Sequence, residues 1–233
     1  MPSAGRHGEE GFTARQQAVL DAALGLLVEQ GDQLTMTAVA RRASCSKETL
    51  YKWFGDRDGL LTATVQWQAA KVTVGAVDRE KLDLASLRAR LEEFAANWLA
   101  VISTKTSIAL NRLAMAHAGL AKANGSKANG SKRDPDRDLG AIVLENGRFA
   151  IARRLKPVLE AGRDAGLIHF DEAEAAFRTF FGLVARDVQI RLLLGDRFIL
   201  TKADIARDAA AAAAQFLTLY APTNPPAKTG AQH

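Results

Sequence analysis

The sequence contains few of the features that mark disulfide-rich, metal-binding or membrane proteins. Its 233 residues include one cysteine, Cys45, which allows no intramolecular disulfide and no zinc site built from several thiolates. The longest nearly uncharged apolar run, Ala209 to Ala221, is shorter than the roughly 18 residues that a membrane-spanning helix needs. Residues 1–10 contain no apolar stretch that resembles a signal peptide. These absences predict a cytoplasmic protein that does not contact a membrane.

Aromatic residues are scarce and the charge is nearly balanced. Apolar residues make up 48% of the chain, which is enough to form the core of a folded protein, although only 6% of residues are aromatic. The formal net charge is +5, yet residues 1–75 carry equal numbers of basic and acidic side chains, and most of the excess lies in residues 122–137. The net charge therefore indicates no nucleic-acid partner by itself.

The sequence also lacks the motifs of common catalytic and cofactor sites. It contains no Gly-x-Gly-x-x-Gly, no phosphate-binding Gly-x-x-x-x-Gly-Lys-Ser/Thr, no His-Glu-x-x-His and no Glu-x-x-His. His117 and His169 are isolated, and the apolar turn context of Cys45 favours packing over a nucleophilic role. We therefore expect no enzymatic activity, no cofactor and no metal site.

Apolar residues recur at helical spacing, and no segment shows sustained alternation with a period of two, which predicts an all-α fold of about nine helices. A capping box at Thr13 predicts a first helix that ends at Gly31, and Thr35, Ser46 and Asp56 are predicted N-caps of the next three helices. Further helices are predicted over residues 84–103, 108–120, 137–165, 171–195 and 201–220.

The predicted helices fall into two domains, over residues 12–70 and 71–220, between a disordered arm (1–11) and a disordered tail (221–233). We expect Pro157 to kink or split the helix over 137–165, because proline cannot donate to the helical hydrogen-bond ladder. A tandem Lys-Ala-Asn-Gly-Ser repeat over residues 122–131 predicts a flexible loop over 121–136. The repeat is either a solvated insertion or a second basic contact surface.

Residues 35–54 have the spacing of a helix-turn-helix motif, with apolar anchors at Val39, Ala40, Cys45, Leu50 and Phe54. Five basic side chains stand against two acidic ones within residues 41–57, so a local positive charge arises in a neutral region. The outer side of the second helix can then reach base edges and phosphates with Lys47, Thr49, Tyr51, Lys52 and Trp53.

The run LTMTAVARRASCSKETLYKWFGDRDGLL, residues 34–61, resembles the DNA-binding domain of the tetracycline-repressor (TetR) family of transcriptional regulators. The resemblance covers about residues 13–70. It implies phosphate contacts by Thr35, Lys47, Tyr51, Lys52 and Arg57 and base or sugar contacts by Thr49 and Trp53. The candidate DNA-binding set is completed by Arg41, Arg42 and Ser46.

Two positions depart from the family pattern. Ser44 occupies a turn position where glycine is usual, and a left-handed conformation there would cost about 1–2 kcal/mol. The segment Gly55-Asp56-Arg57 replaces the commoner lysine-rich link.

The later part of the chain resembles the AefR-like subgroup through Asn111-Arg112-Leu113, residues 162–168 and residues 180–195. This resemblance implies a homodimer formed by helices 171–195 and 201–220, or else these helices form ordinary monomer core. It also implies a pocket for a small-molecule effector. Candidate lining residues are Phe94, Trp98, Arg112, Met115, His117, Phe149 and Phe181.

The resemblance to the TetR family implies a homodimeric transcriptional repressor that is released by a ligand. We expect such a dimer to bind double-stranded DNA at a palindromic operator. The alternative is a helical binding or scaffold protein without sequence-specific DNA binding. Salt dependence of DNA affinity separates the two, because neutralised phosphates release counterions.

Overall fold

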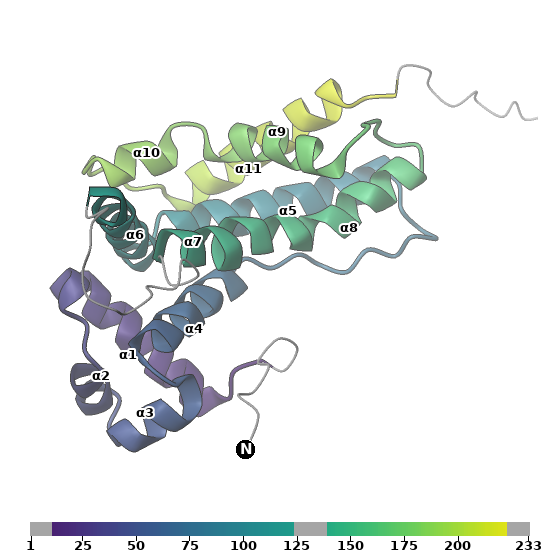
Figure 1. The fold of residues 1–233 in the computed structure, drawn as a ribbon. Helices are drawn as coiled ribbons and strands as arrows, with labels where there is room; N and C mark the ends of the chain where they lie inside the picture. The colour runs from purple at the N-terminus through teal and green to yellow at the C-terminus, as the bar shows by residue number, and fades with distance from the viewer. Residues whose placement is uncertain (1–10, 124–138, 223–233) are drawn as a thin grey trace, which may run out of the picture. The chain divides into compact units, whose positions relative to one another are not determined.

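The computed structural model describes residues 11–123 and 139–222, which form helices and connecting segments and contain no strand (Figure 1). The predicted all-α fold is confirmed. Within the described ranges, no helix is both long enough and apolar enough to cross a membrane. Most of the predicted arm, loop and tail (1–11, 121–136 and 221–233) lies outside the described residues, although residues 121–123 belong to a helix.

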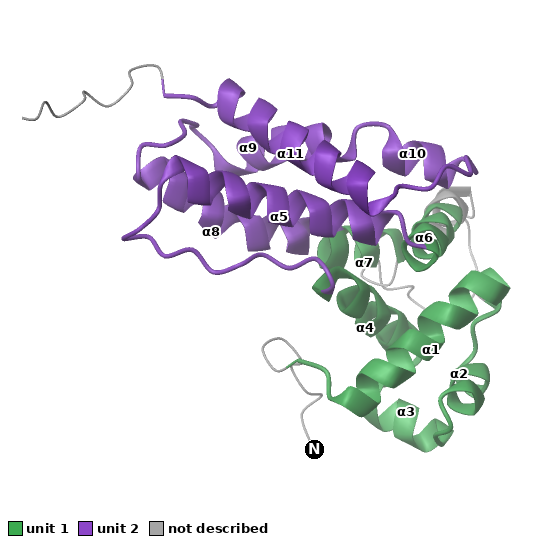
Figure 2. Ribbon diagram, turned by 180° about the vertical axis from the view of Figure 1, so that it is seen from behind, with its two compact units in different colours: residues 1–70, 105–147 green, residues 71–104, 148–233 purple. Residues whose placement is uncertain are grey.

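The chain divides into two compact units (Figure 2). The first unit comprises residues 1–70 and 105–147, and the second comprises residues 71–104 and 148–233. The chain leaves the first unit at residue 70, where the sequence predicts a domain boundary, but it returns to that unit for residues 105–147. The sequence predicts this returning segment within the domain over 71–220, so the predicted division differs from the compact units here.

The first four α-helices of the first unit begin after short polar side chains that cap them. The helices of this unit are α1 (Ala14–Gln30), α2 (Met36–Arg42), α3 (Lys47–Phe54), α4 (Arg57–Ala70), α6 (Lys105–Ala123) and α7 (Leu139–Val143), with a 3-10 turn η1 (Gly31–Gln33) after α1. Thr13, Thr35 and Ser46 each accept a hydrogen bond from the backbone N–H three residues later. Asp56 Oδ1 likewise accepts from the Gly59 N–H at 2.8 Å, so all four predicted N-caps are confirmed.

The core of the first unit joins the helix-turn-helix to α1, α4, α6 and α7. Val19, Leu20, Val39, Leu50 and Leu60 are fully buried in it. Burial of these side chains is the main source of stability for such short helices, since isolated helices of this length are marginal in water. The core thus sets the relative placement of α2 and α3.

The second unit consists of α5 (Leu84–Ile102), α8 (Ala150–Asp164), α9 (Ala173–Ala185), α10 (Val188–Leu193) and α11 (Lys202–Leu219). α11 packs against α5 and α9, and α9 also packs against α8. Aromatic rings from three helices meet in its core, where Phe94 and Phe180 have centroids 6.1 Å apart and Phe180 and Phe216 have centroids 5.1 Å apart.

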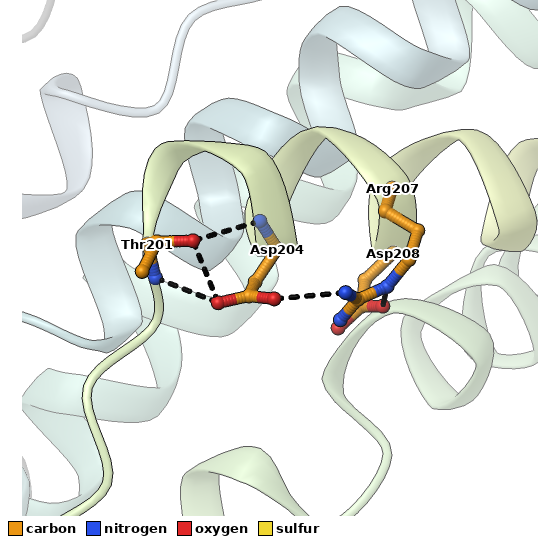
Figure 3. A network of polar contacts seen from close by, with 4 residues as sticks. All are labelled: Thr201, Asp204, Arg207 and Asp208. Atoms are coloured by element: carbon orange, nitrogen blue, oxygen red, sulfur yellow. Dashed lines mark hydrogen bonds and ion pairs between the residues drawn. The ribbon is translucent and has the colours of Figure 1, made fainter.

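A capping box at Thr201 starts α11 (Figure 3). The Asp204 carboxylate accepts hydrogen bonds from the Thr201 hydroxyl at 2.7 Å and from Arg207 Nη1 at 2.8 Å. The Thr201 hydroxyl and backbone, followed by Arg207, hold the pKa of Asp204 below its ordinary value.

The predicted helix over 137–165 is interrupted, but Pro157 is not the cause. A π-helical segment over Leu144–Phe149 separates α7 from α8, whereas Pro157 lies inside α8 without ending it. At the interruption, Asn146 Nδ2 donates to the carbonyl oxygen of Ile142 at 3.1 Å. A side-chain amide that enters the backbone ladder widens the helical turn, which accounts for the different place of the break.

The predicted single helix over 171–195 is wrong. The chain forms α9 and α10 instead, and Arg186 between them adopts a φ of +41° while its N–H donates to the Gly182 carbonyl oxygen. A positive φ cannot continue a right-handed helix, so α9 ends there. Neither glycine nor proline occupies the break, which explains why the sequence did not indicate it.

Candidate nucleic-acid interface

The turn between α2 and α3 is a Schellman motif. The Cys45 N–H donates to the Ala40 carbonyl oxygen at 3.0 Å, and the Ser44 N–H donates to the Arg41 carbonyl oxygen at 3.3 Å. Ser44 has a φ of +50°, the left-handed conformation considered for it in the sequence. Cys45 is half-buried against the core of the first unit, as expected for a packing residue.

Arg15 on α1 holds this turn from outside. Its Nη2 donates to the carbonyl oxygen of Ala43 at 3.0 Å and to that of Ser44 at 2.8 Å. Arg15 is absent from the predicted site residues, because its partners lie 28 and 29 positions further along the chain.

The first turn of α3 is fixed by Ser46, whose hydroxyl accepts from the Thr49 N–H at 3.1 Å. The Ser46 and Thr49 hydroxyl oxygens also lie 3.1 Å apart, so Thr49 Oγ1 has a partner within the protein. The backbone N–H of Glu48 and then the Ser46 hydroxyl keep the pKa of the Glu48 carboxyl below its ordinary value. The recognition helix therefore begins with three polar side chains in a defined arrangement.

Three basic side chains of the motif extend into solvent. Arg41, Lys47 and Lys52 are exposed, and no hydrogen bond or ion pair joins their side chains to the part of the chain that the structure describes. Tyr51 is 51% exposed on the same helix as the two lysines. These four side chains are available to anionic ligands such as DNA phosphates.

Thr49 and Trp53 are half-buried rather than fully exposed. Trp53 packs against the core of the first unit, and its ring meets that of Phe54 edge to face with centroids 6.2 Å apart. Only part of the indole of Trp53 is accessible to a partner.

The side chains of Arg42 and Arg57 differ from this set because each has a partner within the first unit. Arg42 pairs with Glu29 on α1, and this hydrogen-bonded pair keeps the pKa of Glu29 below its ordinary value. Arg57 is half-buried, and its Nε donates to the Leu34 carbonyl oxygen at 3.0 Å. Arg57 also lines a surface hollow of about 580 Å³ together with Tyr51 and the exposed N-cap residue Thr35.

The candidate effector residues do not gather in one unit. Phe94, Trp98, Phe149 and Phe181 belong to the second unit, whereas Arg112 and Met115 are exposed residues of the first. The side chain of His117 lies outside the described residues. Trp98 and Phe181 are in contact, with ring centroids 4.4 Å apart, while Phe149 is 38% exposed.

Arg148 joins three of the aromatic side chains in the second unit. Its guanidinium lies 5.3 Å from the centroid of Phe149, 5.6 Å from that of Phe177 and 5.4 Å from that of Phe181. Arg148 also forms an ion pair with Glu174, in which Nη1 of Arg148 lies 3.6 Å from Oε1 of Glu174. Arg148 is absent from the predicted lining residues, although it directly precedes the predicted Phe149. The ranges that the structure describes contain no group of three or more His, Cys, Asp or Glu side chains that could hold a metal ion.

A capped recognition helix with exposed basic residues, held on a helical core, is typical of a helix-turn-helix DNA-binding protein. Two family matches agree with this class. Residues 19–64 match the bacterial regulatory proteins of the tetR family, and residues 130–222 match the AefR-like transcriptional repressor C-terminal domain.

Similar proteins extend the match over nearly the whole chain. The crystal structure of a TetR transcriptional regulator from Agrobacterium tumefaciens is 43% identical with a TM-score of 0.70, and the match covers 91% of this chain and 97% of that one. The structure of the flavonoid-responsive regulator FrrA is 25% identical with a TM-score of 0.61 and covers 90% and 98% of the two chains. The HTH-type transcriptional regulator BetI of Rhizobium meliloti is 32% identical over 119 residues, which span 45% of this chain and 59% of that protein.

The chain belongs to the TetR family of transcriptional regulators. It is therefore a DNA-binding regulator of transcription rather than an enzyme, as the sequence predicts.

Proposed function

We propose that two copies of this chain bind a palindromic operator and repress transcription until a small-molecule ligand releases them. The observation that carries the proposal is a set of exposed basic side chains, Arg41 on α2 and Lys47 and Lys52 on α3, for which the described residues supply no hydrogen bond or ion pair. The natural partner of such a surface is the phosphate backbone of DNA. The protein acts in the cytoplasm, where bacterial DNA lies.

The two kinds of contact fall to different residues. Lys47, Tyr51 and Lys52 are exposed and contact phosphates, with Arg41 beside them. Thr49 and the accessible part of Trp53 contact bases or sugars. Both residues lie on α3 and are half-buried, so they project less far into solvent than the lysines do. Thr35 and Ser46 shape the surface as N-caps, and Arg57 reaches it from beside the hollow at Thr35. Arg42 stabilises the domain by its ion pair with Glu29 and does not contact DNA.

One recognition helix reads few base pairs, so the proposed operator requires two. Two such helices about 34 Å apart match successive major-groove faces of a palindrome. Candidate dimer surfaces lie on α9 and α11. Gly182 is exposed inside α9, and an added Cβ there would meet no atom within 4 Å. An exposed glycine inside a helix costs about 1 kcal/mol relative to alanine, so close approach of a second helix would account for it.

On α11 the alanine run is divided between core and surface. Ala209, Ala212 and Ala213 are buried within the unit, whereas Ala210, Ala211 and Ala214 are partly accessible. Only the partly accessible alanines are available to another copy of the chain.

The effector is assigned to the second unit. The rings around Arg148 and Trp98 supply an aromatic environment, and Phe149 gives part of it access to solvent. Aromatic compounds are therefore the first class to screen, and the name of the related flavonoid-responsive regulator supports that choice. A ligand that binds more tightly to the state with mis-spaced recognition helices shifts the population away from DNA.

Selection of bound duplexes from a random DNA pool tests the proposal. The expected result is an inverted repeat whose affinity falls steeply as salt rises, since several phosphates per subunit are neutralised. Recovery of no inverted repeat together with a flat salt dependence would favour the helical scaffold protein instead. Compounds are then screened for release of the selected duplex.

A further inference from the structure

Arg15 links the start of α1 to the turn that precedes the recognition helix. One nitrogen, Nη2, donates to both the Ala43 and the Ser44 carbonyl oxygens, at 3.0 and 2.8 Å. Both oxygens lie just beyond the last residue of α2, where carbonyls lack partners within the helix. A charged donor makes stronger hydrogen bonds than a neutral one, so this contact is well suited to hold a backbone turn.

The α2–α3 turn requires stabilisation because serine, rather than glycine, occupies position 44. Ser44 has a φ of +50°, a conformation that glycine adopts freely and that residues with a Cβ adopt at a cost in free energy. The Schellman hydrogen bonds from the Ser44 and Cys45 N–H groups satisfy the end of α2 only while this conformation persists. A relaxation of Ser44 to a negative φ would break them and displace the residues that follow.

The residues that follow start the recognition helix. Ser46, two positions after Ser44, is the N-cap of α3 and bonds the Thr49 N–H. The conformation of Ser44 therefore fixes the point and direction at which α3 leaves the turn.

We propose that Arg15 is a positioning residue for DNA binding, which holds Ser44 in the left-handed conformation and thereby fixes the orientation of α3. The inference rests on the proposed contacts of α3 with DNA. It assigns Arg15 no contact of its own with a phosphate.

Arg15 is exposed, so a direct phosphate contact is the competing explanation for any loss of DNA affinity on its substitution. The two roles predict different effects of an Arg15 substitution on DNA affinity. They differ in how that effect varies with salt concentration and with the residue at position 44. A residue that binds a phosphate contributes about one unit to the slope of log affinity against log salt, whatever residue occupies position 44. A residue that holds the turn leaves the slope unchanged and becomes dispensable when glycine replaces Ser44.

The test is a double-mutant cycle on the full chain with Arg15→Gln, Ser44→Gly and the double variant. Arg88→Gln is the control, because Arg88 is an exposed arginine of α5 without a hydrogen bond or ion pair to another described residue. The probe is a duplex recovered by selection with the wild-type chain. Affinity is measured at several salt concentrations, and unfolding midpoints confirm that each variant is folded.

Arg15→Gln is expected to weaken binding about tenfold at every salt concentration, with an unchanged slope. In the Ser44→Gly background the same substitution is expected to cost less than about twofold, and Arg88→Gln is expected to stay within about twofold of wild type. A slope that falls by about one unit with Arg15→Gln would overturn the inference. An equal loss in both backgrounds would overturn it as well.

Hydrogen exchange at the Cys45 amide tests the same link without DNA, so it separates this inference from the proposed function. Arg15→Gln is expected to speed that exchange at least about threefold, and Ser44→Gly is expected to remove most of the difference. Unchanged exchange at Cys45 in folded Arg15→Gln would contradict the positioning role even if the chain binds no DNA. Absence of DNA binding by the wild type would instead refute the proposed function.

Discussion

Arg42 on α2 and Glu29 on α1 form a two-point ion pair, with Nη1 3.1 Å from Oε1 and Nη2 in contact with Oε2. Bidentate guanidinium–carboxylate pairs fix geometry as well as charge. The pair ties α2 to α1 and offsets one of the five basic charges that sequence analysis counted over residues 41–57. The positive charge available to DNA is therefore smaller than that count suggests.

Glu29→Gln is expected to make the unfolding free energy less sensitive to acid. The hydrogen bond from Arg42 lowers the pKa of Glu29 in the folded protein below its ordinary value of 4.5. A lowered pKa contributes stability that is present above the ordinary value and is lost as pH falls through the folded value. Urea unfolding at about pH 7 and about pH 3 checks this, and Glu92→Gln on α5 is the matched control. An equal loss of stability on acidification in wild type and Glu29→Gln would contradict it.

Ser46→Ala is expected to destabilise the first unit by about 1 kcal/mol, because the hydroxyl accepts the Thr49 N–H at the start of α3. Ser46→Asp keeps an acceptor at the N-cap and should retain most of the stability. Thermal unfolding of both variants measures the difference. Equal stability of Ser46→Ala and wild type would show that the cap contributes nothing.

Lys52→Ala is expected to weaken binding to all DNA sequences by a similar factor and to lower the salt slope by about one. The side chain of Lys52 is exposed and has no ion-pair partner within the described ranges, so its loss removes only a phosphate contact. Thr49→Ala and Trp53→Ala are expected to change sequence preference instead. Repeated selection with each variant distinguishes the two effects. A changed preference with Lys52→Ala would move that residue from phosphate to base contact.

Gly182→Leu is expected to weaken the proposed dimer at least about tenfold without unfolding the subunit. A Cβ added at this position meets no atom of the described residues within 4 Å, so we expect the added side chain to clash with a second chain rather than with its own subunit. Sedimentation velocity across a range of concentrations gives the dissociation constant. Ala89→Leu places the same side chain at an exposed position of α5, which is not one of the candidate dimer helices, and should leave the dimer intact. A dimer of wild-type strength with Gly182→Leu would exclude α9 at this position from the interface.

The sequence by itself determined the local features of this protein. The N-caps at Thr13, Thr35, Ser46 and Asp56 appear where the sequence predicts them, because a cap bonds a backbone N–H only three residues away. The helix-turn-helix could also be predicted from the sequence, because its apolar anchors lie within about twenty residues and repeat at helical spacing.

Only the tertiary structure decided which side chains remain available. The pairing of Arg42 with Glu29 and the contact of Arg15 with the α2–α3 turn join residues 13 to 29 positions apart. The widened turn at Asn146 and the left-handed Arg186 likewise break two helices whose apolar spacing continues across the break. Such contacts depend on which helices pack together, and packing of apolar faces does not specify the polar groups at their edges. The sequence thus determined where the recognition helix lies, and the tertiary structure decided which of the basic side chains around it are held by other parts of the first unit.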